Sequence, residues 1–440
     1  MSKLALFGGE KAVKKSLKEI SFDFVPEKGI KKAEELMRAG EISLSPLVYE
    51  FEEKFGRYIG RKHALCVTSG TTSIQSALFA VGVGAGDEVI VPSFTFWATV
   101  GPVVACNAVP VFADCDVETH NITAEAIEKC ITPRTKAIIA VHVWGTPCDL
   151  DPIVALAKKH NLKLIEDCSH AHGATYNGKK VGTFGDVGCF SMQGSKLLMA
   201  GEGGILVTDN REYYERSLAL GHYERLSSLP EDSEYRKYSL TGFGFKHRIH
   251  PVAAAIADAN LQTLDEYNEI RTKNAKYFEE LMSDLDFITF QKVPEKAERV
   301  YGYHYGTYHK EKFGGLSLYT LLKALTEEGV TCGPCGYGML HKAPLYTEKK
   351  NSPMHAFSCP CYDKEYDLPE TLPNSEFLRE AGIYLAPRFE SATKEDIEQY
   401  SIAYHKVAEN LAALLAYEEE NNLGEKKVDS AGRSITTFKD

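Results

Sequence analysis

LIEDCSHAHGA at residues 164–174 and GDVGCFSMQGSK at residues 185–196 decide the fold of this chain. Each segment contains an apolar run of strand length that ends in polar residues. The first run ends in Asp167, and the second ends in Ser191 and, after a turn, Lys196. Because ligands bind at the carboxyl ends of the strands in such sheets, we expect Asp167 and Lys196 to face one ligand from adjacent strands.

The same pattern of short strand and longer helix extends outward from these two segments. Further strands are expected at 63–67, 88–91, 110–113 and 137–141, with helices at 74–81 and 98–106. Such alternation predicts an α/β fold, in which a mostly parallel sheet is covered by helices.

The character of the chain changes near residue 260. A long helix is expected to run to about residue 282, followed by sparser strands at 287–290 and 301–308 and helices at 316–328 and 394–416. We therefore expect a large domain with its N-terminal segment at 1–270, a smaller α+β domain at 271–416 and a polar C-terminal segment at 417–440.

Composition excludes several classes of partner. The 440 residues carry a net charge of −11 without a local basic patch, so neither nucleic acid nor an anionic membrane is expected to bind. We expect neither a secretory leader nor a membrane span, because the apolar run in MSKLALFGGEKAVKK at 1–15 is short and nowhere do about 18 apolar residues follow one another. Its 11 cysteines are scattered and odd in number, which predicts free thiols and a cytoplasmic protein.

The polar residues occur in the order that pyridoxal phosphate requires. TSGTTS at 68–73 offers a phosphate-binding turn, Phe94, Phe96 and Trp97 offer an aromatic cover, and Asp167 and Lys196 follow. This cofactor takes a lysine as its Schiff-base partner and an acidic residue at its pyridinium nitrogen. Taken singly, the same features are also typical of a surface lysine, a helix-capping aspartate and a plain turn, so the residues alone leave both interpretations open.

A family resemblance adds to this order of residues. The sequence resembles the DegT/DnrJ/EryC1/StrS aminotransferases in SGTTS at 69–73, GAGDEVIVPSFTF at 84–96, VHVWG at 141–145, and most densely from 165 to 210. The resemblance implies the fold type I architecture of pyridoxal-phosphate transferases, and it weakens after about residue 265.

The resemblance also implies roles for individual residues. Lys196 matches the Schiff-base lysine and Asp167 the pyridinium partner, and these two are the catalytic candidates. The other residues that match cofactor contacts are Gly70, Thr71 and Ser191 at the phosphate, Phe96 on the ring face and His170 beside the ring hydroxyl. No metal site is implied.

One departure from the family pattern concerns the partner subunit. Where the family has an asparagine and an arginine, this chain has Lys246 and Arg248. A cation can replace an amide as a donor to a phosphate dianion. We therefore expect a homodimer with shared active sites, in which Lys246 or Arg248 reaches the other subunit's phosphate.

The implied reaction is ping-pong transfer of an amino group from glutamate or glutamine to a keto-sugar or keto-cyclitol. FGG at 313–315 and HKAPL at 341–345 are similar to the cyclitol branch, with a nucleotide sugar as the alternative acceptor. The candidates for contact with the acceptor are Ser43, Ser45, Tyr337 and His341. A pyridoxal-fold sensor without turnover is the alternative from another class, and the presence of Lys196 argues against it.

A cysteine motif at residues 332–335 suggests other chemistry. Cys332 and Cys335 frame a thioredoxin-type CGPC, and Cys359, Cys361, His341 and His355 could add zinc ligands. The following GYGMLHKAP cannot continue the helix that a redox motif needs. We expect ordinary loop thiols here.

Overall fold

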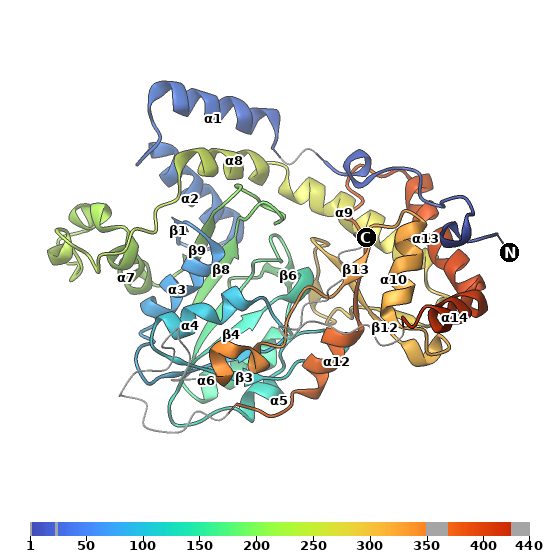
Figure 1. Ribbon diagram of the computed structural model, residues 1–440. Coiled ribbons are helices and arrows are strands. Elements are labelled where there is room, and N and C mark those ends of the chain that lie inside the picture. The colour runs from blue at the N-terminus through green and yellow to red at the C-terminus, as the bar shows by residue number, and fades with distance from the viewer. Residues whose placement is uncertain (1, 23–24, 349–367, 424–440) are drawn as a thin grey trace.

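A seven-stranded sheet forms the centre of the computed structural model, which describes residues 2–22, 25–348 and 368–423 (Figure 1). Its strand order is β1-β9-β8-β5-β4-β2-β3, and β9 runs antiparallel to both of its neighbours while the other pairs are parallel. The strands are β1 (His63–Val67), β2 (Glu88–Pro92), β3 (Val109–Ala113), β4 (Thr135–Val141), β5 (Lys163–Asp167), β8 (Val187–Ser191) and β9 (Gly204–Thr208). The predicted mostly parallel α/β sheet is confirmed.

Helices cover both faces of this sheet, as its continuously apolar strands require. One face packs against α2 (Pro46–Ile59), α5 (Ala124–Glu128), α6 (Leu150–Lys159) and α8 (Pro251–Leu261). The other face packs against α3 (Gly70–Ala80), α4 (Gly101–Ala105) and α7 (Arg211–Gly221). Neighbouring residues of β4 divide between the two cores, Ile138 in the first and Ile139 in the second, because side chains alternate along a strand.

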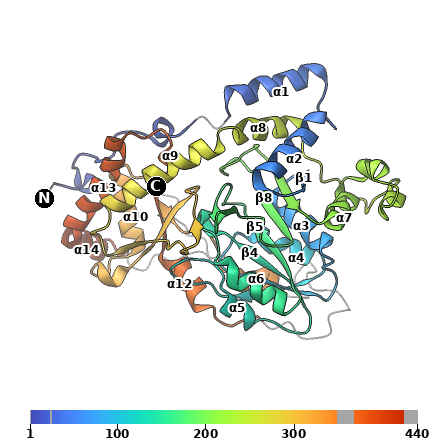
Figure 2. The same cartoon turned by 180° about the vertical axis from the view of Figure 1, so that it is seen from behind.

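The C-terminal part is a second, smaller layer of sheet and helices. Its antiparallel sheet has the order β10-β12-β14-β13, formed by β10 (Ile288–Phe290), β12 (His304–Tyr308), β13 (Gly333–Pro334) and β14 (Gly382–Ala386). Helices α10 (Leu318–Glu327), α12 (Pro373–Ala381), α13 (Lys394–Glu409) and α14 (Leu411–Glu420) accompany it. Figures 1 and 2 show α9 (Leu264–Leu281) extending from the large sheet into this part. The predicted domain boundary lies within α9 and stays a prediction.

Several expected boundaries differ from the structure. The single long helix expected near 260–282 is two helices, because α8 ends at Leu261 and α9 begins at Leu264. The helix expected at 394–416 is likewise divided, and α14 continues to Glu420, into the residues 417–440 that we expected to form a separate polar segment. Residues 424–440 of that segment lie outside the described residues.

Residues 2–20 pack with the C-terminal part, although we expected them to belong with the large domain. Leu4, Val13 and Ile20 belong to the same apolar core as residues of α10 and α13. Buried Glu328 holds them there, since its carboxylate accepts hydrogen bonds from the N–H groups of Ala5 (2.7 Å) and Ala12 (3.0 Å).

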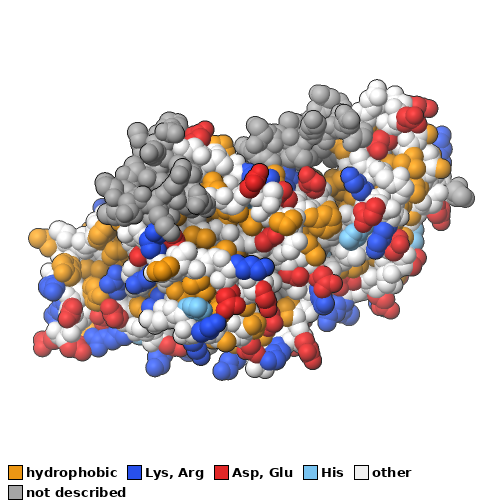
Figure 3. All heavy atoms as spheres, turned by 90° about the horizontal axis from the view of Figure 1, so that it is seen from below, with side chains coloured by type: hydrophobic (Ala, Val, Ile, Leu, Met, Phe, Trp, Pro, Cys, Tyr) orange, Lys and Arg blue, Asp and Glu red, His pale blue; other side chains and the backbone are white. Residues whose placement is uncertain are grey.

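The remaining elements lie at the periphery. Helix α1 (Glu27–Ala39) rests on α8 at the outside of the molecule (Figures 1 and 2). The short elements are α11 (Pro344–Thr347), β6 (Thr175–Tyr176), β7 (Lys179–Lys180), β11 (Ala297–Glu298) and the 3₁₀ turns 5–7, 17–20, 97–99, 143–145, 223–228, 236–238, 310–312 and 340–342. Within the described ranges, every helix is too short or too polar to cross a membrane. On the face drawn in Figure 3, acidic and basic side chains are interspersed.

Candidate active site

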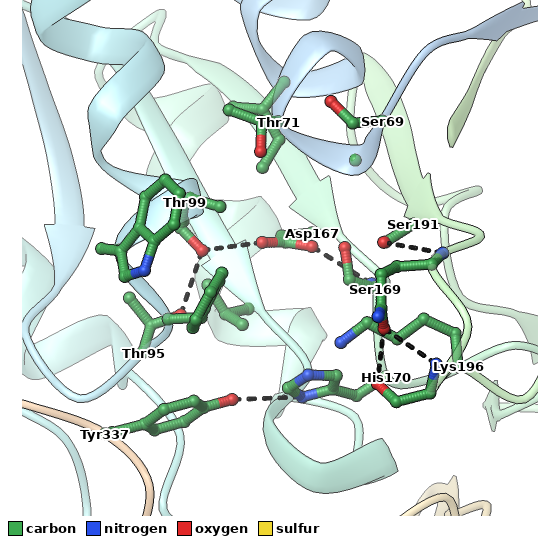
Figure 4. Close-up of a pocket in the computed structure, with 18 of the residues that line it drawn as sticks. Ser69, Thr71, Thr95, Thr99, Asp167, Ser169, His170, Ser191, Lys196 and Tyr337 are labelled. Carbon is green, nitrogen blue, oxygen red and sulfur yellow. Dashed lines mark hydrogen bonds between the residues drawn. The ribbon is translucent and has the colours of Figure 1, made fainter. Parts of the chain in front are cut away.

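A cavity of about 560 Å³ lies at the carboxyl ends of the parallel strands. Nine of the residues singled out in the sequence line it: Gly70, Thr71, Phe96, Trp97, Asp167, His170, Ser191, Lys196 and Tyr337. Figure 4 shows several of these side chains around the cavity. The structure therefore brings residues from five separate segments into one site.

The N-terminus of α3 forms one end of the cavity. The sequence predicted this helix from about residue 74, but it begins at Gly70, so the N–H groups of Gly70 and Thr71 belong to its first turn and have no partner within the helix. Ser69 caps the helix by accepting a hydrogen bond from the N–H of Thr72 (3.1 Å). A Cβ on Gly70 would lie 2.6 Å from the Cβ of Ser191, so only glycine allows this close approach. Free N–H groups at a helix N-terminus beside a serine suit a phosphate group.

Asp167 lies at the end of β5 and is 4% exposed. One carboxylate oxygen accepts a hydrogen bond from the hydroxyl of Thr99 (2.8 Å), and the other accepts one from the N–H of Ser169 (3.1 Å). Figure 4 shows the carboxylate between these two donors. A buried carboxylate that is held in place and lines a cavity suits a cationic ring nitrogen.

Lys196 enters the cavity from the turn after β8, the strand that pairs with β5. The turn is closed by a hydrogen bond from the N–H of Lys196 to the carbonyl of Gln193 (2.8 Å). The Nζ of Lys196 donates a hydrogen bond to the hydroxyl of Tyr303 (3.4 Å). The expected placement of Asp167 and Lys196 from adjacent strands is what the structure has.

His170 belongs to an aromatic wall of the cavity. Its ring stacks on Trp144, with centroids 5.4 Å apart and an interplanar angle of 3°, and its Nδ1 lies 3.3 Å from the hydroxyl of Tyr337 (Figure 4). Burial, together with the positive charge of Lys196, lowers the pKa of His170 well below its ordinary value. The imidazole is therefore neutral at pH 7 and can donate or accept a single hydrogen bond toward a ligand.

Sequence reasoning assigned no role to several cavity residues, of which Trp144, Tyr303 and Tyr305 are the largest. Trp144 stacks on both Tyr305 (3.9 Å) and Tyr337 (4.3 Å). Two features of the sequence could have pointed to them: the tryptophan inside VHVWG at 141–145, and the tyrosines at every second position from 301 to 305. Phe96 also lines the cavity and is 46% exposed, so its predicted ring-stacking role remains a prediction.

Four predicted residues lie elsewhere. Ser43, Ser45 and Arg248 line a second cavity of about 190 Å³, and Ser45 there caps α2 by accepting a hydrogen bond from the N–H of Leu47 (3.4 Å). Lys246 is exposed and lines neither of these two cavities. In the single chain, then, neither predicted cation reaches the first cavity.

The predicted contact of His341 with the acceptor stays a prediction, although His341 does not line the first cavity. Both of its ring nitrogens already have partners. Its Nδ1 lies 2.7 Å from the hydroxyl of Ser93, and its Nε2 lies 3.2 Å from the carboxylate of Glu376. The imidazole is buried and ties the α11 region to α12.

The CGPC cysteines are not activated thiols. Burial raises the pKa of Cys332 to about 12 and that of Cys335 to about 11, and the residues between them form strand β13 instead of opening a helix. A reactive cysteine needs the opposite environment. Of the suggested zinc ligands, His355, Cys359 and Cys361 lie outside the described residues.

One buried group resembles a metal site in composition. His142, Glu166 and Cys168 lie close together behind Asp167. However, the carboxylate of Glu166 already accepts hydrogen bonds from the N–H groups of Gly182 (2.8 Å), Phe184 (2.8 Å) and Gly185 (2.7 Å). These bonds account for the buried charge without an ion.

Comparisons with known proteins point to one family. Residues 25–371 match the model of the DegT/DnrJ/EryC1/StrS aminotransferase family. The chain is 41% identical over 243 residues to a GDP-perosamine synthase from Caulobacter vibrioides, covering 55% of this chain and 64% of that protein's length. It is 37% identical over 317 residues to an L-glutamine:2-deoxy-scyllo-inosose aminotransferase from Streptomyces kanamyceticus, covering 69% of this chain and 71% of the relative.

Solved structures agree as well. An aminotransferase from Psychrobacter cryohalolentis is similar with a TM-score of 0.78 and 26% identity, over 91% of this chain and 100% of that one. The residues present fit pyridoxal phosphate, because a glycine cradle at a helix N-terminus, a buried carboxylate and a lysine line one cavity. The predicted fold type and cofactor are thus confirmed, and this chain belongs to the DegT/DnrJ/EryC1/StrS family of pyridoxal-phosphate-dependent aminotransferases.

Proposed function

We propose that this protein transfers an amino group from glutamine or glutamate to a keto-cyclitol or keto-sugar. The observation that carries the proposal is the meeting of Lys196 and Asp167 with the N-terminus of α3 in one cavity of a chain that belongs to this family. Pyridoxal phosphate, when bound, supplies an aldehyde for the amine and a ring that takes up electrons from the substrate carbon.

The chain's own residues divide the remaining work. The N–H groups of Gly70 and Thr71, with the hydroxyl of Ser191, bind the phosphate. Asp167 keeps the pyridine nitrogen protonated, while Phe96 covers the ring face and His170 contacts the ring hydroxyl. Lys196 carries the cofactor between turnovers, and its freed amine moves the substrate proton.

A keto-cyclitol is the preferred acceptor. The aligned region with the glutamine-dependent inosose aminotransferase covers 69% of this chain, against 55% for the GDP-perosamine synthase, although the latter is the more identical. Tyr337 is the candidate acceptor contact that lines the cavity. A nucleotide sugar is the competing acceptor.

The proposed active unit is a cytoplasmic homodimer with shared sites. Lys246 and Ser43 are exposed, and Arg248 lines the second cavity, so these three are available to a neighbouring subunit, whereas Ser45 in the same cavity is buried. Each cysteine in the described ranges is a free thiol, which suits a reducing compartment.

The test begins with purified protein loaded with pyridoxamine phosphate. Inososes and keto-sugar nucleotides are added one at a time, and the return of the aldehyde cofactor is followed by its absorbance, with Lys196→Ala as the matched control. We expect an inosose to restore the absorbance fastest. A response to nucleotide sugars alone would show that the acceptor is a nucleotide sugar and not a keto-cyclitol. Binding of these compounds without any amino transfer would favour a sensor that binds ligand without turnover.

A further inference from the structure

The hydroxyl of Tyr303 contacts the nitrogen of Lys196. The two atoms lie 3.4 Å apart, and the same hydroxyl lies 3.1 Å from the Oγ of Ser195, the residue before the lysine. Tyr303 precedes β12 in the C-terminal part, whereas Lys196 follows β8 of the large sheet. A residue more than one hundred positions away thus reaches the one amine in the site.

The backbone around Tyr303 is fixed against the lysine turn. A Cβ on Gly302 would lie 3.0 Å from the Cγ of Leu197, so the two segments pack closely. Arg388 joins them, because its Nε donates to the carbonyl of Gly302 (2.9 Å) and its Nη2 donates to the carbonyl of Ser195. Its guanidinium also lies 5.7 Å from the centroid of the Tyr303 ring. The separation of Tyr303 and Lys196 is therefore set by three segments together.

The hydrogen bonds around the phenol have a direction. Lys196 donates to the phenol oxygen, and the phenol can donate its own proton to Ser195, either to Oγ at 3.1 Å or to the carbonyl at 3.5 Å. When Lys196 is in its neutral amine form, its lone pair then stays free to face the cavity.

Charge around the phenol supports the same arrangement. Burial raises the pKa of Tyr303, but the positive charges of Lys196 and Arg388 and the hydrogen bond with Ser195 outweigh it, so the pKa lies below its ordinary value. His170, whose ring centroid is 4.8 Å away, is neutral at pH 7 and adds no charge. The electrostatics thus favour the phenol as an acceptor toward Lys196.

We propose that Tyr303 is a further catalytic residue of the amino transfer, whose oxygen accepts a hydrogen bond from Lys196 and aims the amine's lone pair at the cavity. Arg388 is its positioning residue. The inference rests on the proposed function, and it assigns the control of the lysine to the C-terminal part of the chain.

The experiment separates presentation of the amine from binding of the cofactor. Tyr303→Phe apoprotein is mixed with pyridoxal phosphate, and the covalent linkage is trapped with borohydride at successive times and quantified by mass spectrometry. Noncovalent affinity is measured by calorimetry with pyridoxamine phosphate, which has no aldehyde. We expect the linkage to form about tenfold more slowly, the effect of one lost hydrogen bond, with unchanged affinity for pyridoxamine phosphate.

Tyr384→Phe is the matched control, since Tyr384 lies on β14 opposite Tyr305 and does not line the cavity. It should form the linkage at the original rate. Arg388→Lys loses the planar guanidinium that bridges the carbonyls of Gly302 and Ser195, so it should slow formation of the linkage less than Tyr303→Phe does. Tyr303→Phe forming the linkage at the original rate, or losing affinity for pyridoxamine phosphate in proportion, would overturn the inference. A borohydride label on another lysine would instead overturn the proposed site itself.

Discussion

Asp167 is the residue proposed to keep the pyridine nitrogen of the cofactor protonated. Its carboxylate is buried and held by Thr99 and Ser169, so replacing it with an amide changes the charge while keeping the shape. We expect Asp167→Asn to bind pyridoxamine phosphate but to slow amino transfer by about 10²–10³-fold, because a neutral partner no longer favours the protonated pyridine nitrogen. Single-turnover absorbance measures the rate, and near-normal turnover would make Asp167 a structural residue only.

The sequence allowed some residues of the site to be predicted and hid others. Asp167, Ser191 and Lys196 were predictable because each lies within a few positions of a strand end that its own segment determines. Tyr303 and Trp144 were not, because their place in the cavity depends on contacts between distant segments. The surroundings of His341 were not predictable for a similar reason, since Ser93 and Glu376, which contact its ring, are remote in sequence.

At the scale of elements, strand β5 presents a functional carboxylate on each of its two faces. Glu166 points away from the cavity and accepts hydrogen bonds from the 182–185 loop, and the next residue, Asp167, lines the cavity. Such alternation follows from strand geometry. Glu166 therefore anchors the strand end that presents Asp167.

The anchoring role of Glu166 predicts a dependence of stability on pH. Burial alone would raise its pKa, but His142 and the backbone N–H groups outweigh burial and lower it below the ordinary 4.5. The carboxylate therefore stabilises the fold fully above about pH 4.5, and this contribution is lost as the pH falls through the lowered value. We expect Glu166→Gln to reduce the free energy of unfolding by about 3 kcal/mol at pH 7.

Urea unfolding at pH 7 and at pH 4 checks this expectation. The difference in stability between the original protein and Glu166→Gln should shrink at the lower pH, because the original protein then loses part of what the variant already lacks. An equal difference at both pH values would show that Glu166 acts by packing alone.

The start of α3 gives a second prediction at the scale of elements. We expect Gly70→Ala to weaken binding of pyridoxamine phosphate about tenfold or more, close to 1.4 kcal/mol, because the new Cβ would lie 2.6 Å from that of Ser191 and displace the first turn. Gly84→Ala, where nothing lies within 4 Å, is the control in calorimetry. Unchanged affinity in Gly70→Ala would remove the α3 N-terminus from the phosphate site.

Elements were easier to predict from the sequence than their ends. The strand expected at 63–67 agrees with the structure residue for residue, and the run expected to end in Ser191 is β8, which does end there. The start of α3 came four residues late in the prediction, since TSGTTS has the composition of a turn while Ser69 caps a helix there. The break between α8 and α9 was missed because apolar spacing continues across it.

At the scale of the whole molecule, one surface carries more apolar side chains than a lone chain needs. Leu240 is 89% exposed and Phe243 63% exposed, in the segment that leads to Lys246 and Arg248. Large exposed apolar side chains that gather on one segment are typical of an interface. The exposure of Leu240 and Phe243 supports the proposed dimer. If this segment is part of the dimer interface, Lys246 and Arg248 lie beside that interface.

A mixed dimer tests whether the two active sites are shared. Two-fold symmetry makes any exchange reciprocal, so each chain would give its cations to the other chain's phosphate. One parent carries Lys196→Ala and the other carries Lys246→Ala with Arg248→Ala, and each parent alone is expected to be inactive. If the cations act across the interface, the mixed dimer contains one site with neither defect and one site with both.

We therefore expect the mixture to recover activity once subunits exchange, approaching a quarter of the original activity per chain in an equimolar mixture, since about half of the dimers are mixed and each has one intact site. Exchange is followed separately with a mass tag on one parent, so that a failure to mix is recognised. Exchange without recovered activity would mean that Lys246 and Arg248 act within their own chain, because each site of the mixed dimer would then retain one defect. The single-chain geometry disfavours that outcome, as Lys246 is exposed and Arg248 lines the second cavity instead of the first.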